Sequence, residues 1–207
     1  FRDSGPAASG AWIERTRIVI GAGGRYEHFE INASPADYSR VELDVTLEQG
    51  AHFEFGAVTI GHGQARQEFV TRVAHLHPDA TSNQVVRAVQ GGGSTGNYLG
   101  RIEVARGAQR TDAAQNFRAI LLDRGASANA KPELEIFADD VKCAHGAAIG
   151  QLDPAAAFYM AARGIAPDAA RALLVQAFIA DALAAMGDDE ARGGLLDAAL
   201  AALGERK

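Results

Sequence analysis

The most chemically distinctive stretch of this 207-residue sequence holds its only cysteine and, two residues later, a histidine. Successive side chains of an extended strand alternate between its two faces, so Val141, Cys143 and His145 should point one way. Lys142 and Ala144 should then point the other way. Thiolate and imidazole groups bind iron, copper or zinc. Two ligands do not complete a metal site, and a buried structural cysteine is an equally good interpretation of Cys143.

The remaining histidines give weaker signals. His75 and His77 have a spacing that places two imidazoles on one face of a strand, which suits a metal ion. The neighbouring Pro78 and Asp79 favour a different interpretation, in which both histidines are exposed beside a turn and have no special role.

The sequence lacks the motifs, in the right context, of nucleotide-binding enzymes, serine hydrolases and zinc proteases. Residues 21–24 follow a strand, but the pattern after them continues as strand, so no helix is ready to bind a dinucleotide. Residues 91–96 lack the Lys-Ser/Thr ending of a phosphate-binding loop and indicate a tight corner or a close approach of backbones. The sequence has neither Gly-x-Ser-x-Gly nor His-Glu-x-x-His, the motifs of serine hydrolases and zinc proteases.

Composition sets the remaining bounds. A net charge of −6 gives no support to nucleic-acid binding. A single cysteine cannot form an internal disulfide, which fits a reducing compartment. We find no signal peptide and no run of about 18 apolar residues, so we expect a soluble, cytoplasmic protein without membrane contact. The sequence begins at Phe1 without Met, which leaves open what precedes it.

The elements that must position these residues are mainly strands. Residues 1–11 are small and polar and predict a flexible N-terminal segment, and residues 12–150 carry a β pattern. Residues 41–48 alternate apolar and polar side chains without a fault, as a strand with one buried face requires. Shorter strand-like runs occupy residues 18–20, 53–55, 58–60, 85–86, 102–104, 120–122 and 134–137.

A degenerate repeat connects these runs. Turns recur at Gly23, Gly50, Asp79, Gly107 and Gly125, at intervals of 27, 29, 28 and 18 residues. Repeats of this size indicate stacked coils, because each coil needs neighbours to bury its apolar edge. The Asn-Gly and Asp-Gly dipeptides typical of hairpins are absent, which disfavours a β-sandwich. We therefore predict a parallel β-helix over residues 12–150.

Residues 151–207 predict a small C-terminal helical region. Asp153 can cap a short helix that opens at Pro154 and ends near Gly164. Pro167 opens a longer helix, and a last helix follows Gly187. Alanine-rich helices in so small a number cannot form a large core, so they must pack on the β-region or on a partner.

At residues 138–146, Ala-Asp-Asp-Val-Lys-Cys-Ala-His-Gly, the sequence resembles the SufB/SufD family of the Suf iron–sulfur cluster assembly system. The flanks also fit, with Lys-Pro-Glu-Leu-Glu-Ile-Phe at 131–137 and Phe-Tyr-Met-Ala-Ala-Arg-Gly-Ile at 158–165. The similarity extends from about Thr81 to about Leu183. SufB members share the flanks but lack the Asp-Asp core, so the resemblance is to the SufD members.

The resemblance implies a right-handed parallel β-helix followed by a helical region. It also implies a non-catalytic scaffold subunit that pairs with a SufB-like subunit and docks a SufC-like ATPase, supporting iron acquisition. A transient iron or iron–sulfur cluster would form at the shared interface, and some family assemblies hold a flavin. The family has an N-terminal helical portion that this chain lacks or shows only as a remnant.

Carried over to this sequence, the resemblance assigns residues to each role. Cys143 and His145 would face the nascent cluster. The other interface residues are expected to be Lys131, Glu135, Val141 and Lys142 toward the SufB-like subunit, and Phe158, Tyr159, Arg163 and Ile165 toward the ATPase.

Two alternatives stay open. One is a purely structural, homodimeric β-helix scaffold with an inert Cys143. The other is a polysaccharide-acting β-helix enzyme, which needs two positioned acids. Asp139 and Asp140 are the only adjacent acidic pair near the Cys143 end, and Lys142 follows them.

Overall fold

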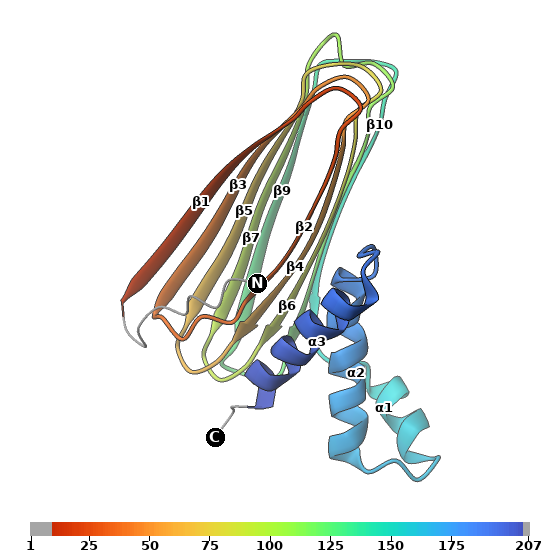
Figure 1. Ribbon diagram of the computed structural model, residues 1–207. Helices are drawn as coiled ribbons and strands as arrows, with labels where there is room; N and C mark the ends of the chain where they lie inside the picture. Colours follow the sequence, from red (N-terminus) through yellow and green to blue (C-terminus); the bar gives the residue numbers. More distant parts are fainter. Residues whose placement is uncertain (1–9, 205–207) are drawn as a thin grey trace.

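The computed structural model describes residues 10–204 and contains ten strands and three helices. The first sheet, here the odd sheet, consists of β1 (Ala11–Ile20), β3 (Tyr38–Leu47), β5 (Arg66–His75), β7 (Thr95–Val104) and β9 (Ser127–Ile136). The second, the even sheet, consists of β10 (Lys142–Gly150), β8 (Asp112–Leu121), β6 (Thr81–Gln90), β4 (His52–Gly61) and β2 (Arg25–Asn32). All neighbours are parallel and consecutive strands alternate between sheets, so the chain forms a five-coil parallel β-helix (Figure 1). The fold prediction is confirmed.

Strand periodicity depends on what covers each sheet. In β3 every second residue is buried, as the alternation at residues 41–48 predicts. In β4 nearly every residue is buried, because helices cover its outer face. The runs at 53–55 and 58–60 therefore belong to one strand, whose two-sided burial removes the alternation on which the prediction relied.

The repeated corner is a ladder of left-handed residues at one end of the coils, formed by Gly23, Gly50, Asp79 and Arg110. Each N–H in this ladder donates to a carbonyl of the next coil, from Gly23 to Gln49 (2.8 Å), Gly50 to Pro78 (3.0 Å), Asp79 to Gln109 (3.0 Å) and Arg110 to Asp140 (2.6 Å). In the fourth copy the left-handed residue is thus Arg110, three positions after the predicted Gly107.

The fifth predicted copy is wrong. Gly125 lies in the turn between β8 and β9, at the opposite end of the coils, where its backbone approaches Gly92. This different corner explains the short interval of 18 residues. Gly92 itself is left-handed and sits against Gly63, so residues 91–96 do form the predicted tight corner with close backbones.

The core runs along the inside of the coils. Phe53 stacks on Phe55 with ring centroids 6.2 Å apart, and Tyr98 stacks on Phe117 at 5.7 Å. All four rings are almost completely buried. Phe53 and Phe55 are alternate residues of β4 and share its inward face, whereas Tyr98 of β7 and Phe117 of β8 meet across the interior from opposite sheets.

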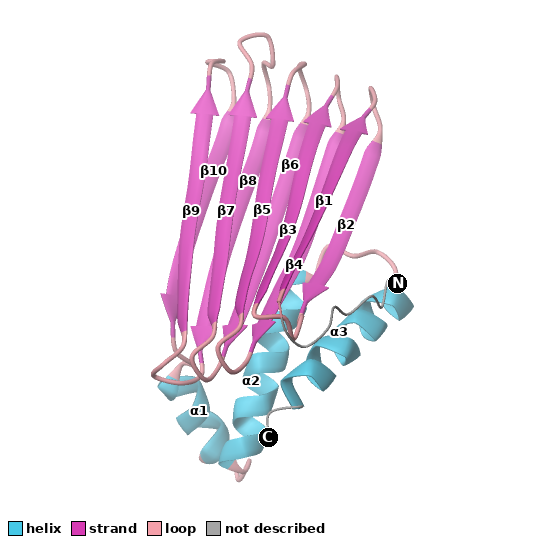
Figure 2. Ribbon diagram, turned by 90° about the vertical axis from the view of Figure 1, so that its left-hand side faces the viewer, coloured by secondary structure: helices cyan, strands magenta, loops and turns pink. Residues whose placement is uncertain are grey.

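The C-terminal region consists of α1 (Pro154–Ala161), α2 (Pro167–Ala182) and α3 (Asp189–Gly204). Asp153 caps α1 by accepting a 2.8 Å bond from the N–H of Ala155. Helices α2 and α3 pack on the outer face of the even sheet, whereas α1 projects away from it (Figures 1 and 2). Among residues 10–204, no helix combines the length and apolar character needed to cross a membrane.

The packing of α2 is close. A Cβ on Gly56 of β4 would lie 2.0 Å from the carbonyl oxygen of Ala182, so the helix backbone rests on the strand backbone. Around this contact an apolar cluster joins the two regions, with Val58, Ile60 and Val89 from the strands and Val175, Ile179, Ala182 and Ala199 from the helices.

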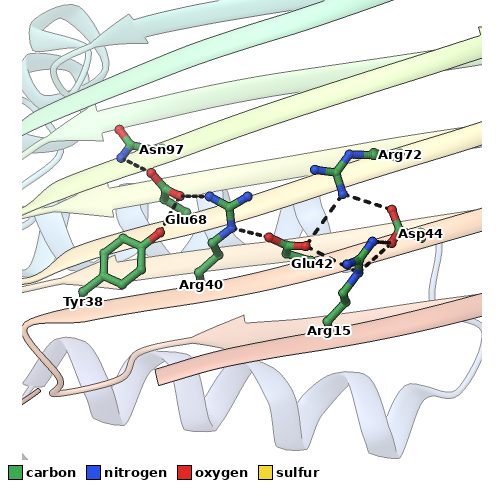
Figure 3. A network of polar contacts seen from close by, with 8 residues as sticks. All are labelled: Arg15, Tyr38, Arg40, Glu42, Asp44, Glu68, Arg72 and Asn97. Atoms are coloured by element: carbon green, nitrogen blue, oxygen red, sulfur yellow. Dashed lines mark hydrogen bonds and ion pairs between the residues drawn. The ribbon is translucent and has the colours of Figure 1, made fainter. Parts of the chain in front are cut away.

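The outer face of the odd sheet is polar (Figure 3). Asp44 of β3 bridges Arg15 of β1 and Arg72 of β5, and Arg40 joins Glu42 to Glu68. Partial burial disfavours the ionised form of Asp44, but hydrogen bonds from the two arginines outweigh it and lower the pKa of the carboxyl. Individual exposed pairs contribute little stability, so this network chiefly keeps the face solvated and the strands in register.

Candidate functional site

The last coil leaves one end of the β-helix open. Within residues 10–204, β9 and β10 each pair with a neighbour on one side only (Figure 2). The N–H of Ser127 donates to the carbonyl of Ser94, and the N–H of Lys142 donates to the carbonyl of Thr111 on the β8 side of β10. Along a parallel strand, successive residues direct their N–H and C=O groups alternately to one neighbouring side and to the other. The N–H and C=O groups of residues 143, 145, 147 and 149 in β10 therefore point to the free edge of the sheet.

Cys143 and His145 lie on the inward face of this open end. They are in register with Ala113 and Gln115, whose side chains are buried inside the preceding coil. Cys143 is half-buried against the apolar cluster that includes Ala113, whereas His145 is exposed. The alternation predicted for this strand agrees with the register.

The surroundings of Cys143 favour the protonated form of its thiol. Burial and the negative charge of Asp112 both raise its pKa, and a backbone hydrogen bond to Ala113 only partly opposes them. A protonated thiol is a poor nucleophile and a poor metal ligand. Across the described part of the chain, no group of three or more His, Cys, Asp or Glu side chains is arranged to hold a metal ion.

The open end also carries apolar side chains that sequence reasoning missed. Ile136 and Ile149 are in register with the buried Val104 and Ala119, yet remain 40% and 46% exposed because no further coil of residues 10–204 covers them. Phe137, in the following turn, is 60% exposed. The signal was present in the sequence: inward positions of a terminal coil stay apolar when something must cover them.

The other residues expected at this interface lie around the same end. Lys131 is exposed and paired with Glu133 at 2.8 Å, and Glu135 is bound by Arg101. Val141 is half-buried and Lys142 is exposed at the start of β10. These side chains therefore border the open end, with the charged ones turned to solvent.

The residues expected to contact an ATPase lie on and after α1. Phe158 is 75% exposed and Tyr159 is 57% exposed. The guanidinium carbon of Arg163 lies 3.4 Å from the centre of the Tyr159 ring, a cation–π contact that fixes the tyrosine. No residue of α1 is buried, while Ile165 is half-buried in the link to α2. Both aromatic rings are thus exposed on α1.

The two turn-proximal histidines do not form a site. His75 is completely buried between the ladder neighbours Leu47 and Val104, and its Nε2 lies 3.0 Å from Oγ of Ser82. Burial lowers its pKa to about 4. His77 lies beyond the strand and pairs with Glu48 at 2.9 Å. The expectation that both histidines are exposed is wrong for His75, because β5 extends through it.

Comparison with known proteins agrees with this architecture. Residues 7–178 match the family described as SUF system FeS cluster assembly, SufBD core domain. An iron–sulfur cluster assembly SufBD family protein of Synechocystis is 36% identical over 183 residues, which cover 88% of this chain and 40% of the relative. The iron–sulfur cluster assembly protein SufD of Escherichia coli is 34% identical over 136 residues, 66% of this chain and 31% of that protein.

The SufD protein of Bacillus subtilis is 28% identical over 131 residues, 63% of this chain and 30% of that protein. The chain thus spans less than half the length of these relatives. The family match covers most of the sequence and includes the open coil, α1 and most of α2. The chain belongs to the SufBD core-domain family of the SUF iron–sulfur cluster assembly system.

Proposed function

We propose that this chain is a non-catalytic scaffold in iron–sulfur cluster assembly, pairing with a SufB-like subunit through β9 and β10. The observation that carries the proposal is the open end of the β-helix. It combines two unpaired strand edges with the exposed apolar side chains of Ile136, Phe137 and Ile149. Unpaired edges and apolar patches are normally protected in a monomer, so a partner coil is the natural cover.

Cys143 and His145 would face the partner across this end. A partner coil would have to supply the remaining ligands of an iron ion or cluster, which is cargo for the assembly machinery. Burial and the negative charge of Asp112 raise the pKa of the thiol in the isolated chain, whereas a cation at the interface would lower it. Ligand function would therefore begin only on pairing.

The proposal also places a SufC-like ATPase on the helical region. The exposed rings of Phe158 and Tyr159 are the kind of aromatic anchors that dominate protein interfaces. Helix α1 contributes nothing to the core, so its apolar surface is best explained by a partner. A homodimer through the β9–β10 edge is the competing arrangement, and it would leave α1 uncovered.

Two exposed phenylalanines separate the two contacts. Phe158→Ala should weaken capture of the SufC-like ATPase by about tenfold or more while leaving association with the SufB-like subunit intact. Phe137→Ala should do the reverse. Pull-down and gel filtration of the full chain measure both. If neither variant affects either partner, or the chain remains a monomer that ignores the SufB-like subunit, the proposal fails.

The ligand role has its own test. Cys143→Ala and His145→Ala should lower the yield of clusters in a reconstituted mixture of the three proteins without reducing complex formation. Unchanged cluster yield in both variants would make the pair inert and leave a purely structural scaffold.

A further inference from the structure

Besides the apolar cluster, a buried arginine of the β-helix binds the helical region through an ion pair. Arg87 of β6 points out of the even sheet beneath α2 and is only 3% exposed. Its Nε and Nη2 donate to the same carboxylate oxygen, Oδ2 of Asp181, at 2.8 and 2.6 Å. Its Nη1 donates to the carbonyls of Val86 and Asn116, and its guanidinium carbon lies 5.8 Å from the ring centre of Phe178.

We propose that the Arg87–Asp181 ion pair is a latch: it keeps α2, with α1 attached, closed on the even sheet, and its loss releases them as a unit. The inference concerns the chain alone and does not depend on the proposed function.

The cost of an unpaired Arg87 is the physical reason. A buried charge is tolerated when a partner charge compensates it, and removing one partner leaves the other uncompensated. Arg118 of β8 stands in register with Arg87, and its positive charge adds to the cost of keeping Arg87 charged. Burial already lowers the pKa of Arg87, which Asp181 opposes. Without the carboxylate charge, the simplest relief for Arg87 is exposure to water, which requires α2 to move.

The position of Asp181 makes the latch accessible. Its side chain is 52% exposed, in contrast to 4% for that of Arg87. Both donors converge on Oδ2, so a basic side chain of a partner can approach the carboxylate from solvent and compete for it. Two further polar contacts between these regions lie nearer the ends of the helices, from Arg171 to the carbonyl of Leu122 and between His62 and the carbonyl of Ala202.

The closest contact between α2 and the even sheet lies at the C-terminal end of the helix. The last turn of α2 holds the buried Ile179, and the buried Leu183 follows directly after Asp181 and Ala182; the backbone of this turn rests on Gly56. The first turn of α2 and all of α1 expose most of their side chains. Outside that turn α2 buries only Ala170 and Val175, and α1 buries no residue, so these two helices have little else to hold them on the sheet when the turn is released.

Amide hydrogen exchange of the full chain tests the latch. In Asp181→Asn, amides at residues 178–183 should exchange about tenfold faster or more, while β3 and β5 keep their protection. Asp168→Asn is the matched control, because it removes an exposed acid from the first turn of the same helix without touching Arg87. It should exchange as the wild type does.

A double variant tests whether the uncompensated charge of Arg87, rather than the loss of its attraction to Asp181, opens the helices. Arg87→Met together with Asp181→Asn removes both charges, and slow exchange at 178–183 should return to within about threefold of the wild type. Wild-type exchange in Asp181→Asn would overturn the proposal. So would acceleration spread equally over the strands, or a double variant that opens as fast as Asp181→Asn.

Discussion

At the scale of single residues, two titratable side chains behave as their surroundings dictate. His75 occupies an inward ladder position with apolar neighbours, so it is held neutral, with its pKa lowered to about 4. Cys143 occupies the equivalent face at the open end, where burial and Asp112 keep the thiol protonated. Each residue type suggested metal chemistry, but position within the coil decides its charge.

His75 predicts a pH dependence of stability. Its folded pKa lies below the ordinary 6.5, so the unfolded chain binds the extra proton and stability falls as the pH drops from about 6.5 towards 4. This group should cost the wild type about 2 kcal/mol between pH 7.5 and pH 5. Urea unfolding of His75→Gln should show a loss smaller by that amount. Parallel pH profiles for the two proteins would contradict the assignment.

The charge of Asp112 predicts the reactivity of Cys143. Asp112→Asn should lower the pKa of the thiol and speed its alkylation by iodoacetamide at pH 7.5 about twofold, since lower basicity partly offsets the larger thiolate fraction. Asp139→Asn, a nearby exposed acid that does not act on the thiol, should leave the rate unchanged. The chain has one cysteine, so mass spectrometry reads a single site. A slower rate in Asp112→Asn would refute the electrostatic cause.

At the scale of elements, the sequence predicted those whose signals are local. The alternation at 41–48 and the Asp153–Pro154 start of α1 need only a strand or a helix end, and the structure contains both. The corner at Gly125 and the burial of His75 depend on which turns stack and where strands end. Those are properties of several coils together, and a degenerate repeat did not resolve them.

The corner glycines predict unequal tolerance to a methyl group. Gly92 has a left-handed φ of 66°, and a Cβ there would lie 3.0 Å from the carbonyl oxygen of Gly63. Gly92→Ala should therefore lower the free energy of unfolding by about 1–3 kcal/mol. Gly107 is not left-handed and has open space around it, so Gly107→Ala should change stability by less than about 0.5 kcal/mol. Urea titration measures both, and equal effects would contradict the corner geometry.

At the scale of the whole molecule, the two sheets and the helices divide the surface. The outer face of the odd sheet is covered by a charged network, and helices cover much of the even sheet. Deleting everything after Gly150 would expose the apolar patch around Val58 and Val89 as well as remove α1. Substitutions in α1 are therefore a cleaner test of ATPase docking than truncation. The open end remains a surface whose inward-facing apolar side chains, Ile136 and Ile149, lack a cover within the described chain.

Pairing through the open end predicts opposite effects for two adjacent residues of β10. The N–H of residue 147 points to the free edge, while that of residue 148 points to β8. Ala147→Pro removes a donor that only a partner strand would use, so it should weaken association with the SufB-like subunit while changing the melting temperature of the isolated chain little. Ala148→Pro breaks the ladder to β8 and should lower that melting temperature by several degrees, on the order of 5 °C. Calorimetry and analytical ultracentrifugation separate the two effects. If Ala147→Pro pairs as the wild type does, partner binding does not extend the even sheet through β10.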